Sequence, residues 1–250
     1  MIRKLKALSL ALGAVFAMGA VMASSASAVT DVFTNSKGAG ADLLTGVGTD
    51  HVFSIGNSKF ECTTSKFAAT ATQGDKVITA DVIYESTPNV TPHVAKEHCL
   101  GPLNHKIVVD MNGCSYDLNG ETTGVHKGVA GNDATVWITC PVGKEIQITD
   151  TSVGVTVSVH EQTPTEGGVI YTNLPKHPGG EAIEVTATVT GITYTCAPAF
   201  LCALQEISAE ANNSTYTGHV KMTCYEDKNV KPEITPANEG PQTGCKTSTV

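Results

Sequence analysis

The sequence predicts an all-β protein: an antiparallel β-sandwich, stapled by disulfide bonds and built from two similar modules. Three observations support this prediction. The 250 residues include 33 Thr and 26 Val but only 16% charged residues, and such an excess of β-branched side chains favours pleated strands over helices. Short β-rich runs alternate with turn signals, without helical spacers between them. The chain also carries eight cysteines, an even number.

The first thirty residues have the three parts of a secretory signal peptide. A basic start at Arg3, Lys4 and Lys6 precedes an uncharged apolar run over residues 7–22 and a small-residue site that ends at Ala28. The run is shorter than the roughly 20 residues that a spanning helix needs. We therefore expect a signal peptide over residues 1–28, cleavage after Ala28 and secretion, with an uncleaved membrane anchor as the alternative. No second long apolar stretch follows, which predicts no membrane span in the mature chain.

Removing the signal makes the chain more acidic. It leaves 222 residues with 13 basic and 24 acidic side chains, a net charge of −11. A nucleic-acid binder needs a basic patch that releases phosphate counterions, so the charge argues against nucleic acid as a partner. A chain of this length can bury about 70% of its unfolded surface, as one large β domain or as two smaller ones.

Strands are expected from residue 59 onward. Asn112-Gly113 and Asn119-Gly120 flank a five-residue run, and because Asn-Gly is a strong two-residue hairpin turn, the pair predicts a β-meander. The only helix candidate is Ala199–Ala209. Strands this short and numerous favour a sandwich, with a closed barrel as the alternative. The expected strands are Lys59–Thr63, Lys66–Thr72, Lys76–Glu85, His105–Met111, Cys114–Leu118, Ala134–Cys140, Glu145–Thr149, Gly154–Glu161, Val169–Asn173, Ala182–Thr195, Leu204–Glu210 and Thr215–Tyr225.

The cysteines are interpreted as four disulfide bonds. A zinc site needs pairs of the C-x₂₋₄-C type, whereas the closest pair here has five residues between its members. Closure of short loops favours Cys62–Cys99 and Cys114–Cys140. In the second half, Cys196–Cys202 with Cys224–Cys245 competes with Cys196–Cys224 plus Cys202–Cys245. We also expect Cys245 to tie the Pro-, Asn- and Thr-rich tail, residues 226–250, to the body.

Three short signatures recur in the same order and indicate an internal repeat. Val82-Ile83-Tyr84 with Pro88 matches Val169-Ile170-Tyr171 with Pro175. Gly113 and Tyr116 match Gly191 and Tyr194, and Val136, Thr139 and Cys140 match Val220, Thr223 and Cys224. This order predicts one β module over residues 29–150 and a second over residues 151–250, which includes the C-terminal tail.

The repeat singles out Trp137, the only tryptophan in the chain. Lys221 occupies the matching position, and a lysine is rarely buried without a partner. We therefore expect Trp137 to face outward, where it is a candidate ligand platform or interface anchor; the alternative is that it packs on the neighbouring module or a loop. Tyr84 and Tyr171 are the next candidate binding residues.

Two other kinds of chemistry have weaker signals. His93, His98 and His105 surround Cys99 and are weak candidates for a metal site, but they lack the helical spacing and the glutamate of H-E-x-x-H. Asp81, Glu85, Glu145 and Glu161 are candidate carboxylates for a hydrolase. No nucleophile elbow or glycine-rich phosphate loop occurs, so we expect no catalytic residues and no cofactor.

Three pieces of the chain are similar to stretches in uncharacterised exported β-rich proteins of high-GC Gram-positive bacteria. They are Asn112-Gly113-Cys114-x-Tyr116, Ile138-x-Cys140-Pro141-x-Gly143 and Thr190-Gly191-Ile192-Thr193-Tyr194. The resemblance implies a bacterial, secreted, disulfide-bonded and β-rich protein, and it transfers no activity and no functional residue.

Together these features predict a secreted, non-enzymatic binding or structural protein of the cell envelope or extracellular space. Its partner is open, with an extracellular glycan or protein as the candidates. The alternatives are a secreted hydrolase that acts on polysaccharide and a metal-handling protein.

Overall fold

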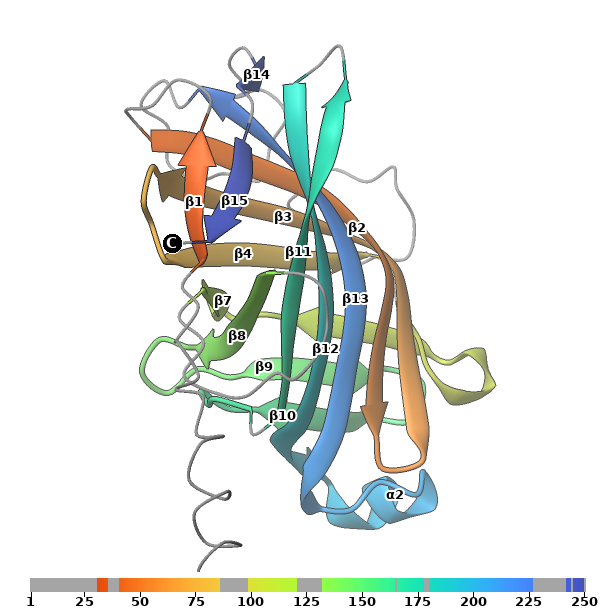
Figure 1. Ribbon diagram of the computed structural model, residues 1–250. Coiled ribbons are helices and arrows are strands. Elements are labelled where there is room, and N and C mark those ends of the chain that lie inside the picture. The colour runs from red at the N-terminus through yellow and green to blue at the C-terminus, as the bar shows by residue number, and fades with distance from the viewer. Residues whose placement is uncertain are drawn as a thin grey trace, which may run out of the picture.

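The computed structural model describes residues 31–35, 41–85, 99–120, 132–164, 166–177, 180–226, 242–243 and 245–249 (Figure 1). These residues form an almost entirely antiparallel β structure with four disulfide bonds, as the composition predicted. The signal peptide, Pro88, His93 and His98 lie outside the described residues, and so do the side chains of Glu85 and Pro175.

The strands are β1 Asp31–Asn35, β2 Ala41–Ile55, β3 Ser58–Thr72, β4 Val77–Glu85, β5 Cys99–Leu100, β6 Lys106–Asp110, β7 Ser115–Asn119, β8 Asn132–Thr139, β9 Ile146–Asp150, β10 Val155–Val159, β11 Glu166–His177, β12 Gly180–Ala197, β13 Glu210–Glu226, β14 Gln242–Thr243 and β15 Cys245–Thr249. A 3₁₀ turn, η1, covers Pro102–Asn104, and the helix α2 covers Ala199–Leu204, inside the range expected for a helix.

The strand ladders close into two rings that share four long strands. β13 pairs with both β2 and β12, and β3 pairs with β2, β4 and β5. The first ring is therefore β2-β3-β4-β7-β8-β11-β12-β13, and the second is β2-β3-β5-β6-β9-β10-β12-β13. The shared strands β2, β3, β12 and β13 are 15 to 18 residues long, enough to run from one ring into the other.

Both rings enclose one continuous hydrophobic core. Buried side chains from every strand of the two rings belong to the same cluster, for example Phe60 and Ile107 from the second ring and Val82 and Val169 from the first. Strands from before and after residue 150 also pair directly, as β2 does with β13. A sandwich and two modules are therefore not confirmed.

The proposed repeat maps onto adjacent strands. β4, β7 and β8 are neighbours in the sheet, and so are β11, β12 and β13. Gly113 and Gly191 both have positive φ angles, 82° and 72°, and the backbone there adopts a conformation that favours glycine. Tyr194 is fully buried, and the matching Tyr116 is packed against the core. The duplication stays a prediction, but these positions place both copies side by side in one ring.

Separate elements cover the two ends of the molecule (Figure 1). At one end β1 and β15 form a two-stranded sheet against β3, β8, β11 and β12, with Phe33 buried beneath it. The Cys224–Cys245 disulfide attaches this sheet to β13, as expected for the tail. At the other end α2 connects β12 to β13, and Cys202 on α2 is bonded to Cys196.

All four disulfides follow the pairing that local closure favoured. Cys62–Cys99 joins β3 to β5, and Cys114–Cys140 links the beginning of β7 to the end of β8. In the second half the structure has Cys196–Cys202 and Cys224–Cys245, the first of the two alternatives.

The predicted β-meander is wrong. Asn112 and Gly113 do form a tight turn, with φ angles of 50° and 82° and a hydrogen bond from the Cys114 N–H to the Met111 carbonyl. However, β6 before the turn pairs with β5 and β9, whereas β7 after it pairs with β4 and β8. The turn passes the chain between partners that lie far apart in sequence instead of joining a hairpin.

Three other strand expectations need correction. Lys59–Thr63 and Lys66–Thr72 are parts of the single strand β3, and the expected strand Leu204–Glu210 contains the end of α2 and an irregular segment. β2, with 15 residues, was not expected at all, because Gly46, Gly48 and the polar residues after them resemble a turn.

Candidate ligand-binding cavity

An apolar cavity of about 60 Å³ lies inside the two rings. Its wall is contributed by strands of both rings and by Pro164, which lies between β10 and β11. None of the described residues that line it carries a charge. One part of the wall is aromatic and the rest is mainly aliphatic; the lining includes Phe53, Phe67, Tyr116, Tyr216, Ile138, Ile146, Ile148, Val159, Val189, Ile192 and Met222.

A buried histidine lies next to the aromatic part of this wall. His51 is fully buried, and its ring packs against Phe67, Tyr84 and Tyr216 at centroid distances of 6.0, 5.4 and 6.0 Å. An irregularity in β2 positions it: the register between β13 and β2 shifts between Thr217 and His219, and Asp50 has a φ of 57°. Such bulges re-aim a side chain within a strand.

Two glycines provide the space for the His51 ring. Gly48 lies on β2 and Gly218 on the neighbouring β13. A Cβ atom at either position would overlap the imidazole ring; at Gly48 it would also overlap the Ser65 hydroxyl, and at Gly218 it would lie 2.7 Å from the Tyr216 hydroxyl. A glycine inside a strand often marks such a close approach.

Hydrogen bonds connect five side chains from β2, β3, β4, β7 and β13. The Ser65 hydroxyl is 2.5 Å from Nε2 of His51, and Nδ1 of His51 is 2.8 Å from the Tyr216 hydroxyl. The Tyr84 hydroxyl lies 3.3 Å from that of Tyr216 and 3.1 Å from that of Tyr116. This network ends on two tyrosines, Tyr116 and Tyr216, that line the cavity.

The network is neutral at ordinary pH. Burial lowers the pKa of His51 to about 4, so its imidazole carries no charge above that pH. Burial also raises the pKa of Tyr84 and Tyr216 well above the usual value near 10, and that of Tyr116 to about 12. The hydroxyls therefore keep their protons, and the aromatic end of the cavity presents neutral hydrogen-bonding groups.

The low pKa of His51 predicts a specific acid sensitivity. Between pH 6.5 and 4 the unfolded chain protonates this histidine and the folded chain does not, so the free energy of unfolding falls as the pH falls through that range. The shift from 6.5 to about 4 corresponds to at most about 3 kcal/mol. Denaturant unfolding at several pH values should show this loss in the native protein, and a smaller one in His51→Asn. Equal pH dependence in the two proteins would contradict it.

The predicted site residues do not converge. Tyr84 and Tyr171 are buried, at 3% and 7% exposure, so a binding role for either would have to act from the interior. Tyr84 belongs to the hydrogen-bonded network and contacts Tyr116 and Tyr216, whereas Tyr171 does not line the cavity. Sequence reasoning did not single out His51, Ser65 or Tyr216; the alternation of His51, Phe53 and Ile55 was the available signal.

Trp137 faces outward, as predicted, with 41% of its surface exposed. On the same face Asp117 lies directly across from it on β7. The Asp117 carboxylate accepts hydrogen bonds from the hydroxyls of Thr79, at 2.6 Å, and Thr139, at 2.8 Å. Trp137 therefore lies on an outer strand face, separate from the cavity.

His105, the described member of the candidate metal site, has a structural partner instead. Its Nδ1 is 2.8 Å from Oδ2 of Asp150, which also accepts a hydrogen bond from Gln205 after α2. Burial alone would raise the pKa of Asp150, but hydrogen bonds from His105, Gln205 and the Ser152 N–H outweigh it and lower that pKa. Among the described residues no group of three metal-ligating side chains occurs.

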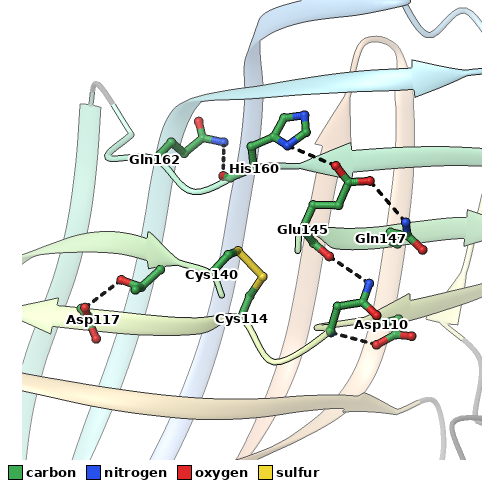
Figure 2. The surroundings of a disulfide bond; sticks show 10 residues. Asp110, Cys114, Asp117, Cys140, Glu145, Gln147, His160 and Gln162 are labelled. Atoms are coloured by element: carbon green, nitrogen blue, oxygen red, sulfur yellow. Dashed lines mark hydrogen bonds and ion pairs between the residues drawn. A yellow bond between two sulfur atoms is a disulfide. The ribbon is translucent and has the colours of Figure 1, made fainter. Parts of the chain in front are cut away.

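Carboxylates near the Cys114–Cys140 disulfide are bonded to their neighbours (Figure 2). Glu145 accepts hydrogen bonds from Ser158 at 2.7 Å and Gln147 at 3.2 Å, and it lies 3.1 Å from Nδ1 of His160. The Ser158 bond is the main reason that the pKa of Glu145 is lowered. Asp110 accepts a bond from a backbone N–H in the adjacent turn. None of these groups lines the cavity.

Comparison with protein-family models, with curated proteins and with solved structures found no match. Within the described part of the chain, no helix is long and apolar enough to cross a membrane.

Proposed function

We propose that this chain is a secreted, non-enzymatic binding protein that holds a small apolar molecule in its interior cavity. The basic, apolar and small-residue parts of residues 1–28 support export. The four disulfides suit an oxidising compartment outside the cytosol.

The uncharged cavity carries this proposal. Ligand sites are commonly concave and mostly apolar, with a few polar groups that fix orientation, and the two cavity-lining tyrosines provide such groups here. Empty apolar space forfeits dispersion contacts on its walls, so a molecule that fills it stabilises the folded chain. Engineered apolar cavities stay dry and bind benzene or xenon for the same reason.

The buried Ser65–His51 pair has the geometry of a nucleophile and its base, but its position does not suit catalysis. Both side chains have no exposed surface, and neither lines the cavity. A nucleophile has to reach substrate. We assign the pair a positioning role: His51 holds the hydroxyl of Tyr216 in place on the cavity wall.

A cavity-filling substitution tests the proposal. Ala187 on β12 lines the cavity, and Ala187→Val puts two methyl groups into the free space. We expect toluene to bind the native protein and to bind Ala187→Val at least about tenfold more weakly, measured by isothermal titration or ligand-detected NMR. Ala203→Val, on the exposed side of α2, is the matched control and should bind as the native chain does. Native affinity in Ala187→Val would contradict the cavity as the site.

Trp137 supports a second candidate, recognition of an extracellular glycan on the outer face. An exposed aromatic ring beside a carboxylate that two threonines orient is suited to stacking on a sugar ring. Because the chain has one tryptophan, its fluorescence reports on this face alone. Titration with an N-acetylglucosamine oligosaccharide should shift the emission to the blue if the face binds sugar. Unchanged emission up to millimolar concentration would count against this candidate.

The other two interpretations of the sequence have less support. A polysaccharide hydrolase needs carboxylates that converge on a cleft, and Asp110, Asp117 and Glu145 are engaged locally instead. A metal-handling role would depend on His93 and His98, which lie outside the described residues, because His105 is paired with Asp150.

A further inference from the structure

The polar groups on the cavity wall differ in how much hydrogen-bonding capacity they have left. The Ser214 hydroxyl donates to the Ile192 carbonyl at 2.7 Å. The Tyr216 hydroxyl lies between His51 and Tyr84. Tyr116 has one hydrogen-bond partner among the described residues, the Tyr84 hydroxyl at 3.1 Å. Since a phenol hydroxyl can donate one bond and accept further ones, Tyr116 retains the most capacity.

The position of the Tyr116 ring is fixed. It stacks on Tyr216 with centroids 6.4 Å apart and an interplanar angle of 19°. Tyr216 is in turn held by His51, whose ring fits between Gly48 and Gly218. The network therefore presents the Tyr116 hydroxyl in a defined place at the aromatic end of an otherwise apolar space, and this arrangement suits a ligand with one polar end.

We infer that the ligand is an uncharged molecule about the size of one aromatic ring, with a single hydroxyl group that pairs with the hydroxyl of Tyr116. The inference rests on the proposed function and adds the class of ligand. A charged ligand is excluded because the lining holds no opposite charge to compensate its desolvation. A ligand hydroxyl fits both directions of the Tyr84–Tyr116 bond: it accepts a hydrogen from Tyr116 when Tyr84 donates, and it donates when Tyr116 does.

The size of the cavity limits the ligand. A free volume of about 60 Å³ is less than half of the roughly 150 Å³ in an apolar cavity that holds benzene. A ring-sized ligand therefore has to displace a side chain of the wall. Met222 is the adaptable lining residue, because its unbranched thioether repacks at low cost. Long-chain lipids would need a far larger rearrangement.

Phenol and toluene test the inference as a matched pair, because they differ by a hydroxyl in place of a methyl group. In the native protein we expect phenol to bind about fivefold to tenfold more tightly than toluene. In Tyr116→Phe, which keeps the ring and its stacking, phenol should bind no more tightly than toluene, and the toluene affinity should stay within about twofold of native. Tyr194→Phe removes a buried hydroxyl away from the cavity and should keep the native preference.

The outcomes separate the two proposals. If toluene and phenol both bind but phenol has no advantage, or if its advantage persists in Tyr116→Phe, the ligand class is wrong and the cavity proposal stands. If neither compound binds the native protein, both proposals fail. A measurement on the native chain is independent of the folding of the variant: with ¹³C-labelled tyrosine, phenol should shift the Cζ resonance of Tyr116 more than toluene does. Equal shifts would overturn the inference.

Discussion

Replacing Cys62 and Cys99 together with alanine lowers the free energy of unfolding by about 4 kcal/mol, the largest loss expected from any of the four disulfides. The reason is loop length: this bond closes 37 residues, and the entropy that a cross-link removes from the unfolded chain grows with the length of its loop. The bond also holds β5 against β3, the pairing that completes the second ring. Both sulfurs are buried, so the loss appears in the folded core.

The Cys196–Cys202 bond is the matched comparison. It closes only six residues, and removing it by the same double substitution should cost about 2 kcal/mol. Denaturant unfolding of the native protein and the two double variants measures both losses. The order would be reversed if the bond at α2, and not the closure between β3 and β5, were the main constraint on the fold.

Gly218→Ala is expected to cost about 3–5 kcal/mol of unfolding free energy. The added methyl group would occupy the space of the His51 ring and approach the Tyr216 hydroxyl at 2.7 Å. Overpacking of a core costs about 1–3 kcal/mol, and a buried polar group that loses its partner costs a similar amount. Moving His51 also displaces Tyr216 from the cavity wall, so Gly218→Ala should weaken the binding of toluene as well.

A double-mutant cycle identifies the cause. His51→Ala removes the ring and leaves room for a methyl group at position 218, so Gly218→Ala should cost much less in the His51→Ala background. Gly154→Ala serves as a control, because Gly154 has a φ of 75° and a Cβ atom there would meet nothing within 4 Å; it should show only the strain of the backbone, about 1–2 kcal/mol. Full additivity of the two changes at 51 and 218 would contradict the steric account.

The sequence was sufficient for the features that depend on local chemistry. The excess of Thr and Val predicted the strands, and short loops predicted the correct disulfide partners, including Cys196–Cys202. The lysine at the position that matches Trp137 predicted that this residue faces outward. These inferences need only a residue, its neighbours along the chain and the alternation of a strand.

Features that depend on distant partners were not predictable. Gly48 resembled a turn residue, but its lack of a side chain makes room for the imidazole ring of His51 and the hydroxyl of Ser65. Asn112-Gly113 forms its tight turn without forming a hairpin, because β6 pairs with β9 and β7 with β4. The cavity is likewise invisible in the sequence, since its wall comes from strands spread over most of the chain.

The most direct test of the account is to locate a bound apolar molecule by NMR. With toluene near saturation, we predict intermolecular NOEs from its protons to the methyl groups of Ile138, Ile148 and Val189, which line the cavity on three different strands. The resonances of the Trp137 indole, on the outer face, should stay unchanged. NOEs confined to surface residues such as Trp137, or none at saturation, would contradict the claim that the interior of the two rings is the binding site.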